Sequence, residues 1–423
     1  MSIGRLPPGS DTLRGLRKTA LPSLRKDVET MRLQTQMLRS GLFLVLIAAL
    51  PVVSQAAKRV TVAQLTQTVT ADVGAQKADA EIARKIAGIE LSERLTEPTL
   101  ALLATALKTD SRAGLALQLL ADESSFLDPP STELPPTPAP DDATQRRVLD
   151  AARSYVAQTL PRLPNLLASE TTDRYDDSPQ QGKNGGWPVR AGLHLLGTSS
   201  REVSVYEEMA NRSTVTSARW QDQVGLTSGG EFASTLAMVL TDTVQGKVTW
   251  SHWEQTATGL AAVFHYSVPR GASHFVVVGA LQQQASLEGS PAQMGNSRVS
   301  GIEVKPSANS SRISTFHTTA GYHGSLSLDP DTGSILRVTV EVDSKEKVPF
   351  QRAAILVVYG PVQIGDRQFI CPVRSVALSI ALPNTNLDPL TRLPGDAPTQ
   401  WLNESTFTGY RRFSSTVRVV PDA

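Results

Sequence analysis

The stretch YHGSLSLDPDTGSILRVTVEV, residues 322–342, decides the fold class. Its second half alternates apolar with polar residues, which is typical of a strand with one buried face. The apolar set is Leu336, Val338, Val340 and Val342, and the polar set is Arg337, Thr339 and Glu341. Before it, the segment Asp329–Gly333 has a proline that presets a turn and a glycine that supplies a positive φ. The stretch therefore predicts an antiparallel hairpin with one apolar face.

Further strand-like segments surround this hairpin. They are residues 260–268, 274–278, 354–364, 368–380 and 414–420. The segment Glu231–Val244 has a helical stripe instead, made by Phe232, Leu236, Val239 and Leu240. Numerous strands that are polar on one side favour an antiparallel sheet, and the helix is the expected cover of its apolar face.

The region before residue 127 has the spacing of short helices. Four stripes are expected to pack on one another: Val62, Leu65 and Val69; Ile82, Ile86 and Ile89; Leu100, Leu103 and Leu107; and Leu115, Leu119 and Leu120. Thr61, Thr96 and Asp110 are the expected amino-terminal caps.

A linker is predicted between the helices and the strands. Residues 128–142 hold six prolines in fifteen positions, a composition that favours extended, semi-rigid chain. Residues 143–160 are helical again by their spacing. The sequence thus divides into a basic flank and signal at 1–56, short helices at 57–127, the linker at 128–142, and a connecting helix with a β domain at 143–423.

An export signal is predicted near the amino terminus. Residues Gly41–Val53 read GLFLVLIAALPVV, an apolar run of 13 residues, which is shorter than the roughly 20 that span a bilayer. Arg39 precedes the run, and Ser54 and Ala56 place small residues at the −3 and −1 positions of a cut after Ala56. We expect a secretory signal peptide over Gly41–Ala56 and a mature chain that is periplasmic or extracellular.

Two features of this region stay open. Translation could begin at Met1, Met31 or Met37, and the later starts would shorten a flank that is long for a signal peptide. An uncleaved amphipathic or membrane anchor is the alternative to cleavage. Because no cysteine lies near the cut, a lipoprotein anchor is excluded, and we expect no stable membrane attachment after cleavage.

The composition is that of an ordinary globular protein. Hydrophobic residues make up 40% of the 423 positions and charged residues 19%, which does not fit a disordered chain. The formal net charge of +1 gives no basic surplus of the kind that nucleic-acid binding requires. Cys371 is the single cysteine, so no intramolecular disulfide or cysteine-based zinc site can form, and its apolar surroundings favour a buried thiol.

The hairpin rhythm resembles known exported proteins. Three segments carry the resemblance: VFHYSV followed by SHFVVV, then residues 322–342, then VVYGPVQIGDRQFICPVRSVAL. They resemble uncharacterised exported bacterial proteins and, more loosely, the curved half-barrels of periplasmic lipoprotein carriers (LolA-like) and RseB-like sensors. The resemblance covers Val263–Leu378 and carries no single functional residue. The resemblance implies an antiparallel, curved, half-barrel-like sheet. Together with the short amino-terminal helices and the covering amphipathic helix that the sequence patterns predict, this gives an α+β protein.

Signals of catalysis are sparse. The sequence has no G-x-S-x-G motif, no glycine-rich phosphate loop and no H-E-x-x-H pair. His252, His265 and His274 fall on neighbouring predicted strands and could converge on a metal, but sheet histidines are more often hydrogen-bonded surface residues. We therefore expect neither a metal site nor a cofactor.

A ligand groove is the leading expectation for the sheet. Trp250, His252 and Glu254 alternate along one strand and are expected on one face, beside Phe264 and Tyr266 of the next strand. Ordinary core packing is the alternative for Trp250. These five residues are the candidate lining of the groove.

Three functions are weighed. The leading hypothesis is a non-enzymatic envelope protein whose curved sheet binds an apolar small molecule or an envelope protein. The second is a structural scaffold that docks through its helical region, which predicts an exposed apolar patch on residues 59–127. The third is a hydrolase that uses His252, Glu254 and His265, which requires these side chains to come within hydrogen-bond reach of one another.

Overall fold

The computed structural model describes the part of the chain that follows Ala56. The described residues are 58–159, 162–163, 165–177, 192–204, 225–226, 231, 234–256, 258–283, 312–346, 348, 350–381 and 399–412. The predicted signal segment and the predicted strand at residues 414–420 lie outside them. Residues Ala57–Ala423 belong to one structural unit.

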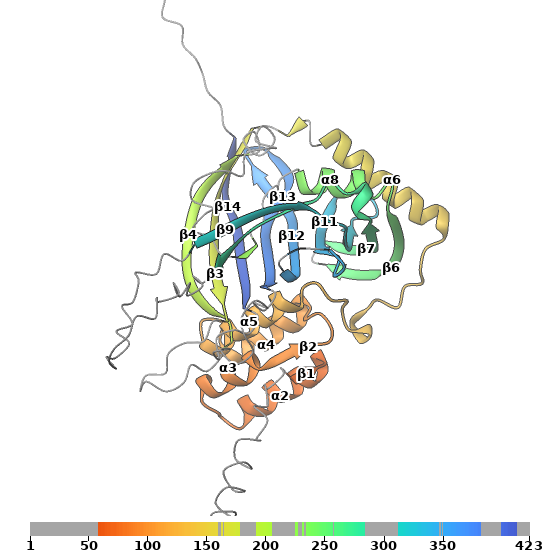
Figure 1. The fold of residues 1–423 in the computed structure, drawn as a ribbon. Coiled ribbons are helices and arrows are strands. Elements are labelled where there is room, and N and C mark those ends of the chain that lie inside the picture. The colour runs from red at the N-terminus through yellow and green to blue at the C-terminus, as the bar shows by residue number, and fades with distance from the viewer. Residues whose placement is uncertain are drawn as a thin grey trace, which may run out of the picture. The chain divides into compact units, whose positions relative to one another are not determined.

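Nine strands form the main sheet, and every pairing in it is antiparallel (Figure 1). From one edge to the other, the order is β4 (His194–Ser204), β3 (Leu166–Asp176), β14 (Gln400–Arg412), β13 (Arg367–Ala381), β12 (Phe350–Ile364), β11 (Ile335–Val342), β10 (Tyr322–Leu328), β7 (Gly259–Val268) and β6 (Lys247–Thr256). The sheet is curved and does not close. The prediction of an α+β protein with a curved antiparallel sheet is therefore confirmed.

The turn predicted at Asp329–Gly333 and the turn between β12 and β13 each close a hairpin and contain a glycine with a positive φ. Between β10 and β11, the Gly333 amide donates to the Asp329 carbonyl (2.9 Å), and Gly333 has a φ of +72°. The Asp329 carboxylate accepts the amide of Asp331 at 2.8 Å, which is the side-chain bond expected of an aspartate that starts a turn. Between β12 and β13, Gly365 has a φ of +65°. Glycine supplies this left-handed conformation at both places without steric cost.

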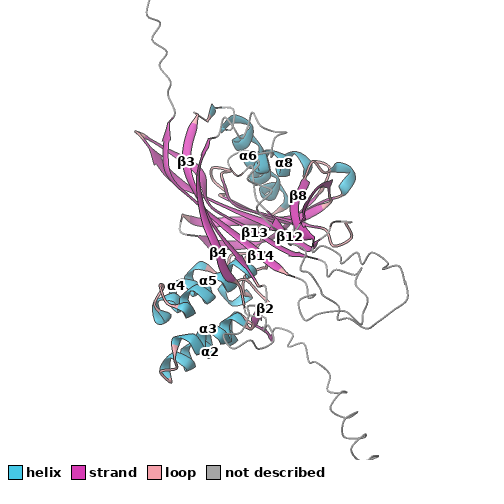
Figure 2. Ribbon diagram, turned by 60° about the vertical axis from the view of Figure 1, so that its left-hand side comes forward, coloured by secondary structure: helices cyan, strands magenta, loops and turns pink. Residues whose placement is uncertain are grey.

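One face of the sheet, here called the inner face, packs against two helices. These are α6 (Asp142–Thr159) and α8 (Ser234–Asp242), and Figure 2 shows both on the same side of the sheet as β8. The helices contribute buried Val148, Ala152, Val156, Leu236, Val239 and Leu240 to the largest hydrophobic cluster. The sheet contributes side chains that alternate along each strand, such as Val338 and Val340 of β11.

A small three-stranded sheet also lies on the inner face. It has the order β5 (Gly225–Leu226), β8 (Val276–Gln283) and β9 (Arg312–Thr319). The Leu226 amide donates to Ser379 Oγ of β13 (3.0 Å), and the Leu226 carbonyl accepts from Asn403 Nδ2 of β14 (2.7 Å). Leu226 and Val277 join the same hydrophobic cluster as the two helices. The protein's own segments thus fill much of the inner face.

The amino-terminal helices form a region with its own hydrophobic cluster. Its elements are β1 (Lys58–Val60), α2 (Val62–Gly74), α3 (Asp79–Ala87), β2 (Ile89–Leu91), α4 (Glu97–Leu107) and α5 (Arg112–Ser124). The four helices and the Thr61 cap agree with the sequence patterns. We refer to residues 58–127 as the helical region.

Three details of this region correct the predictions. Ile89 does not continue the stripe of α3, because it starts β2, which pairs in parallel with β1. Ser111 caps α5 in place of Asp110, since its hydroxyl accepts the amide of Gly114 at 3.0 Å. Leu115 is 44% exposed and lies outside the core. A two-turn pattern cannot distinguish a helix end from a three-residue strand, which explains the first error.

The helical region packs on the opposite face of the main sheet, here called the outer face. Leu119 of α5 and Phe126 join a cluster with Leu356 of β12 and Leu378 of β13. Leu356 precedes Val357, which belongs to the inner-face core, so the two side chains point to opposite sides of β12. The centre of the sheet is therefore buried on both faces.

The proline-rich segment 128–142 contacts both parts of the chain that it connects. It contains a short 3-10 turn, Ser131–Glu133, whose Glu133 carboxylate accepts the hydroxyl of Thr99 at 2.9 Å. Further along, the Pro138 carbonyl accepts Trp253 Nε1 of β6 at 2.9 Å. These bonds anchor the segment to the helical region at one end and to the edge of the sheet at the other.

Candidate functional site

A β-bulge separates the residues that the sequence places on one face of β6. Trp250 pairs with Phe264 of β7, whereas His252 pairs with Val263, and the register shifts between the two pairs. Because Val263 and Phe264 are consecutive, Trp250 and His252 point to opposite faces. The prediction that Trp250, His252 and Glu254 share one face is therefore wrong, because one extra residue in β6 reverses the alternation.

Three of the five candidate residues pack in the inner-face core. Phe264 is 1% exposed and Tyr266 is 3% exposed, and both belong to the core cluster. Trp250 is partly buried against this cluster, with its ring 5.3 Å from Phe264 in an edge-on arrangement. The other two candidates, His252 and Glu254, lie on the outer face.

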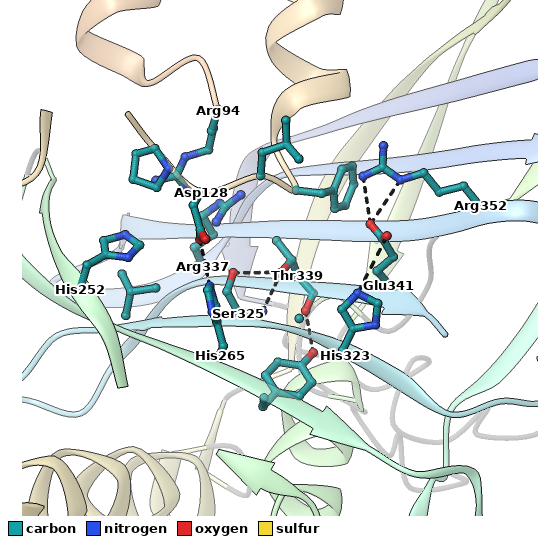
Figure 3. Close-up of a pocket in the computed structure, with 16 residues that line it drawn as sticks. Arg94, Asp128, His252, His265, His323, Ser325, Arg337, Thr339, Glu341 and Arg352 are labelled. Atoms are coloured by element: carbon teal, nitrogen blue, oxygen red, sulfur yellow. Dashed lines mark hydrogen bonds and ion pairs between the residues drawn. The ribbon is translucent and has the colours of Figure 1, made fainter. Parts of the chain in front are cut away.

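A cleft of about 400 Å³ opens on the outer face, between the sheet and the helical region. The helical region and the start of the proline-rich segment supply Arg94, Phe126, Leu127, Asp128 and Pro129. The strands supply His252, Val263, His265, Tyr266, His323, Gly324, Ser325, Arg337, Thr339, Glu341 and Arg352 (Figure 3). The polar alternation of β11 puts Arg337, Thr339 and Glu341 into this lining. We call this space the outer cleft.

Hydroxyl groups form the floor of the outer cleft, where the ladder between β10 and β11 is interrupted. The Ser325 amide donates to Thr339 Oγ1 (2.8 Å) in place of a backbone carbonyl. The Thr339 carbonyl instead accepts the Tyr266 hydroxyl, at 2.6 Å. Tyr266 reaches it across Gly324, its partner on β10, because glycine has no side chain to block the ring.

At one end of the outer cleft, the lining residues Arg94 and His252 lie beside the carboxylate of Glu254. Arg94 Nη2 lies 2.5 Å from Glu254 Oε1, and His252 Nε2 lies 3.8 Å from Glu254 Oε2. Burial alone would raise the pKa of Glu254, but its neighbours His252 and Arg94 outweigh burial and lower that pKa to about 2. Glu254 is thus a carboxylate at neutral pH.

Three atoms at this end are buried without a hydrogen bond to any described residue: Arg94 Nη2, whose ion pair lacks hydrogen-bond geometry, His252 Nε2 and Glu254 Oε2. The side chain of Arg94 is 8% exposed and that of His252 is 10% exposed. A buried polar group without a hydrogen bond costs about 1–3 kcal/mol, so such groups usually mark a place where water or a ligand binds. The two nitrogen atoms, Arg94 Nη2 and His252 Nε2, thus have no hydrogen-bond acceptor among the described residues.

A second arginine, Arg337, lies beside this end (Figure 3). Its guanidinium donates to the Ser125 carbonyl of the helical region. Burial and the neighbouring Arg94 lower the pKa of Arg337 to about 9. Nearby, His265 Nε2 lies 2.9 Å from Asp128 Oδ1, and this bond raises the pKa of His265.

The other end of the outer cleft is an ion-pair cluster that is already satisfied. Arg352 Nε and Nη2 both donate to Glu341 Oε2, at 3.2 and 2.9 Å. The same guanidinium lies 5.3 Å above the ring of Phe126, within range of a cation–π contact. His323 Nδ1 lies 2.8 Å from Asp343 Oδ1.

The predicted convergence of three histidines is incomplete. His252 and His265 both line the outer cleft, but His274 bonds Asp242 through Nδ1 (2.5 Å), and Asp242 also accepts the Tyr322 hydroxyl. No group of three metal-ligating side chains occurs among the described residues. For the hydrolase alternative, the 3.8 Å between His252 and Glu254 exceeds a hydrogen bond, and His265 bonds Asp128.

Several residues of the outer cleft carried no signal in the sequence. Arg94 and Phe126 belong to the helical region, and no local pattern relates them to strands more than 100 residues away. The alternation along the strand places Arg337 and Glu341 on its polar side, which in most strands faces solvent. Only their contact with a second region of the chain turns that surface into a cleft.

No described helix has the length and apolar character that crossing a membrane requires. No family model matches the chain, and comparison with curated proteins and with solved structures yields no match either. The resemblance to periplasmic half-barrel proteins therefore stays a prediction.

Proposed function

We propose that this chain is an exported binding protein, without a catalytic role, that holds a small polar ligand in the outer cleft. One observation carries the proposal. Arg94 and His252, both at least nine-tenths buried, have nitrogen atoms without hydrogen-bond partners among the described residues, and both line the cleft. A cleft of about 400 Å³ falls within the usual size range of small-molecule sites.

The contacts of the inner face argue for the outer cleft over an apolar groove. The helices α6 and α8 and the strands β5 and β8 all place buried side chains in the inner-face core. Phe264 and Tyr266, the apolar candidates for a groove, are taken up by this core. An apolar ligand would have to displace segments of the protein itself, whereas the outer cleft is open to a ligand.

Native mass spectrometry tests this proposal. The chain would be purified without detergent from a periplasmic fraction, which also tests export, since N-terminal sequencing should then begin at Ala57. We expect a reproducible extra mass of a small polar molecule. The variant Ser325→Phe, whose ring would fill the floor of the outer cleft, should no longer carry the bound molecule. The control Gly197→Ala, on β4, should still carry it, because an added Cβ there meets nothing within 4 Å.

Two outcomes would point elsewhere. A carried lipid that Ser325→Phe retains would support the apolar-ligand hypothesis. A bare chain that forms dimers would support docking through the helical region, where Leu102 of α4 is 65% exposed and Leu115 of α5 is 44% exposed. These two leucines are the observation that favours the scaffold as second candidate, because exposed apolar residues on one region can mark a protein interface.

A further inference from the structure

We infer that the ligand of the outer cleft carries an oxyanion, a carboxylate or phosphate group, which binds at the end formed by Arg94, His252 and Arg337. This inference rests on the proposed function and narrows its ligand class. It follows from the charges of the lining, from the bonding partners of its arginines and from the hydrogen bonds of His252.

The lining of the outer cleft has more cationic than anionic side chains. It contains three arginines against two carboxylates, those of Asp128 and Glu341, while a third carboxylate outside the lining, Glu254, pairs with Arg94. Glu341 binds Arg352, and Asp128 binds His265, so each carboxylate already has a cationic or protonatable partner. A buried charge is costly unless it is paired, so an unbalanced guanidinium in this lining favours an anionic ligand.

Arg337 is that guanidinium. In the described part of the chain, its Nη2 donates to the Ser125 carbonyl, a neutral acceptor, and it forms no ion pair. Together with burial, the positive charge of Arg94 lowers the pKa of Arg337, although the carboxylates of Glu254 and Asp128 partly offset this repulsion. An oxyanion between the two arginines would offset it further, and the planar fork of a guanidinium matches a carboxylate or phosphate with two parallel hydrogen bonds.

His252 can supply a further donor. Its Nδ1 lies 2.8 Å from the Ser251 hydroxyl. When that hydroxyl donates to Nδ1, the ring proton sits on Nε2, the buried nitrogen without a hydrogen bond. Nε2–H is then a donor that a ligand oxygen can satisfy. Glu254, which is not among the lining residues, keeps Arg94 in place through its ion pair.

The rest of the outer cleft fits a polar organic body. The hydroxyls of Ser325 and Thr339 lie on the floor and bond each other at 2.9 Å, and each hydroxyl can still accept or donate a further bond. The Phe126 ring and its stacked Arg352 close the far end. Because Arg352 already binds Glu341 through two nitrogens, the oxyanion belongs at the Arg337 end.

Isothermal titration calorimetry with matched probes tests the inference. The probes are glucose 6-phosphate and glucose, which differ by one phosphate, together with citrate and inorganic phosphate. We expect glucose 6-phosphate or citrate to bind at least about tenfold more tightly than glucose, because glucose lacks the charged group that would accept the charge-assisted hydrogen bonds of the arginines. If inorganic phosphate binds as tightly as glucose 6-phosphate, the free ion is the ligand and the hydroxyl floor adds nothing.

Variants locate the site. Arg337→Gln should weaken oxyanion binding by at least about tenfold, and Arg337→Lys, which keeps the charge but loses the fork, should weaken it less. Arg411→Gln is the matched control, because it removes an exposed guanidinium that pairs with Glu202, away from the cleft lining. Circular dichroism and thermal unfolding would establish that each variant folds.

The failures are distinguishable. If glucose and glucose 6-phosphate bind equally and Ser325→Phe abolishes both, the outer cleft binds a ligand, but the oxyanion inference is wrong. If no oxyanion probe binds, the inference is also overturned, while a carried mass that depends on Ser325 would leave the proposed function standing. If Arg337→Gln binds the oxyanion probes as tightly as the unchanged protein, the anion binds elsewhere and the inference is overturned.

Discussion

Arg374 on β13 binds the carboxylate of Asp122 at the carboxyl-terminal end of α5, across 252 residues of sequence. The same guanidinium binds Glu404 of β14 through Nε, at 2.6 Å. Asp122 is 1% exposed, so this ion pair lies inside the contact between the helical region and the outer face. Together with Arg337 and the Ser125 carbonyl, it links the end of α5 to the sheet.

Replacing Arg374 is expected to destabilise the protein strongly. Arg374→Met leaves Asp122 and Glu404 close together without their cation, and breaking a buried ion pair from one side costs about 3–5 kcal/mol. Asp122→Asn should cost less, because Arg374 keeps Glu404 as its partner. The free energy of unfolding from urea titration checks both variants. Equal, small losses of about 1 kcal/mol or less would show that this contact contributes little.

The stability of the protein is expected to fall as the pH rises from about 5 to 8. Burial raises the pKa of Glu123 to about 7, from an ordinary value of 4.5, and it also raises the pKa of Asp122, although the paired Arg374 opposes that shift. The folded protein then binds these protons more tightly than the unfolded chain, so their stabilising effect is lost as the pH rises toward 7. His265 acts in the same direction, because its bond to Asp128 raises its pKa and the benefit disappears when the ring loses its proton.

Urea titrations at several pH values between 5 and 8 check this expectation. Glu123→Gln removes one of the titrating groups and should flatten the slope, with the largest gain in stability near pH 8. Asp331→Asn, in an exposed turn, is the matched control and should leave the slope unchanged. A free energy of unfolding that increases between pH 5 and 8 would contradict the expected direction.

The main features of the fold could be predicted because they depend on local patterns. Alternation over residues 335–342 and 260–268 marks β11 and β7, and the Asp329–Gly333 turn fixes how two strands pair. Where the pattern is interrupted, the prediction fails. The bulge after Trp250 reverses one end of β6, and the sequence pattern does not predict β14, which lies between β13 and β3.

The outer cleft could not be predicted, since it arises from contacts between distant parts of the chain. Arg94 and Ser125 reach Glu254 and Arg337 only after the helical region has packed on the sheet. A single sequence contains no local signal for such contacts. The sequence does point to His252 and Glu254, yet the reason, a shared face with Trp250, is wrong.

Gly333 is expected to tolerate alanine less well than Gly365 does. Both have a positive φ, so alanine costs about 1–2 kcal/mol of backbone strain at either position. At Gly333, a Cβ would also lie 2.5 Å from the carbonyl carbon of Ala151 in α6, whereas at Gly365 it meets nothing within 4 Å. Thermal or urea unfolding should therefore show the larger loss for Gly333→Ala. Equal losses would mean that the turn between β10 and β11 does not pack against α6 in solution.

Gly324 is expected to be among the most sensitive positions of the cleft floor. A Cβ at this position would overlap the Thr339 carbonyl and lie 2.9 Å from the Tyr266 hydroxyl, so Gly324→Ala should break their hydrogen bond and push β10 away from β11. Overpacking of this kind costs about 1–3 kcal/mol.

Tyr266→Phe removes the same hydrogen bond without adding volume, and it should cost about 1–3 kcal/mol if the Thr339 carbonyl stays buried and unpaired. The matched control is Gly197→Ala, which should change the free energy of unfolding by no more than about 0.5 kcal/mol. If Gly324→Ala is as mild as that control, the close approach of β7, β10 and β11 that shapes the floor is not present in solution.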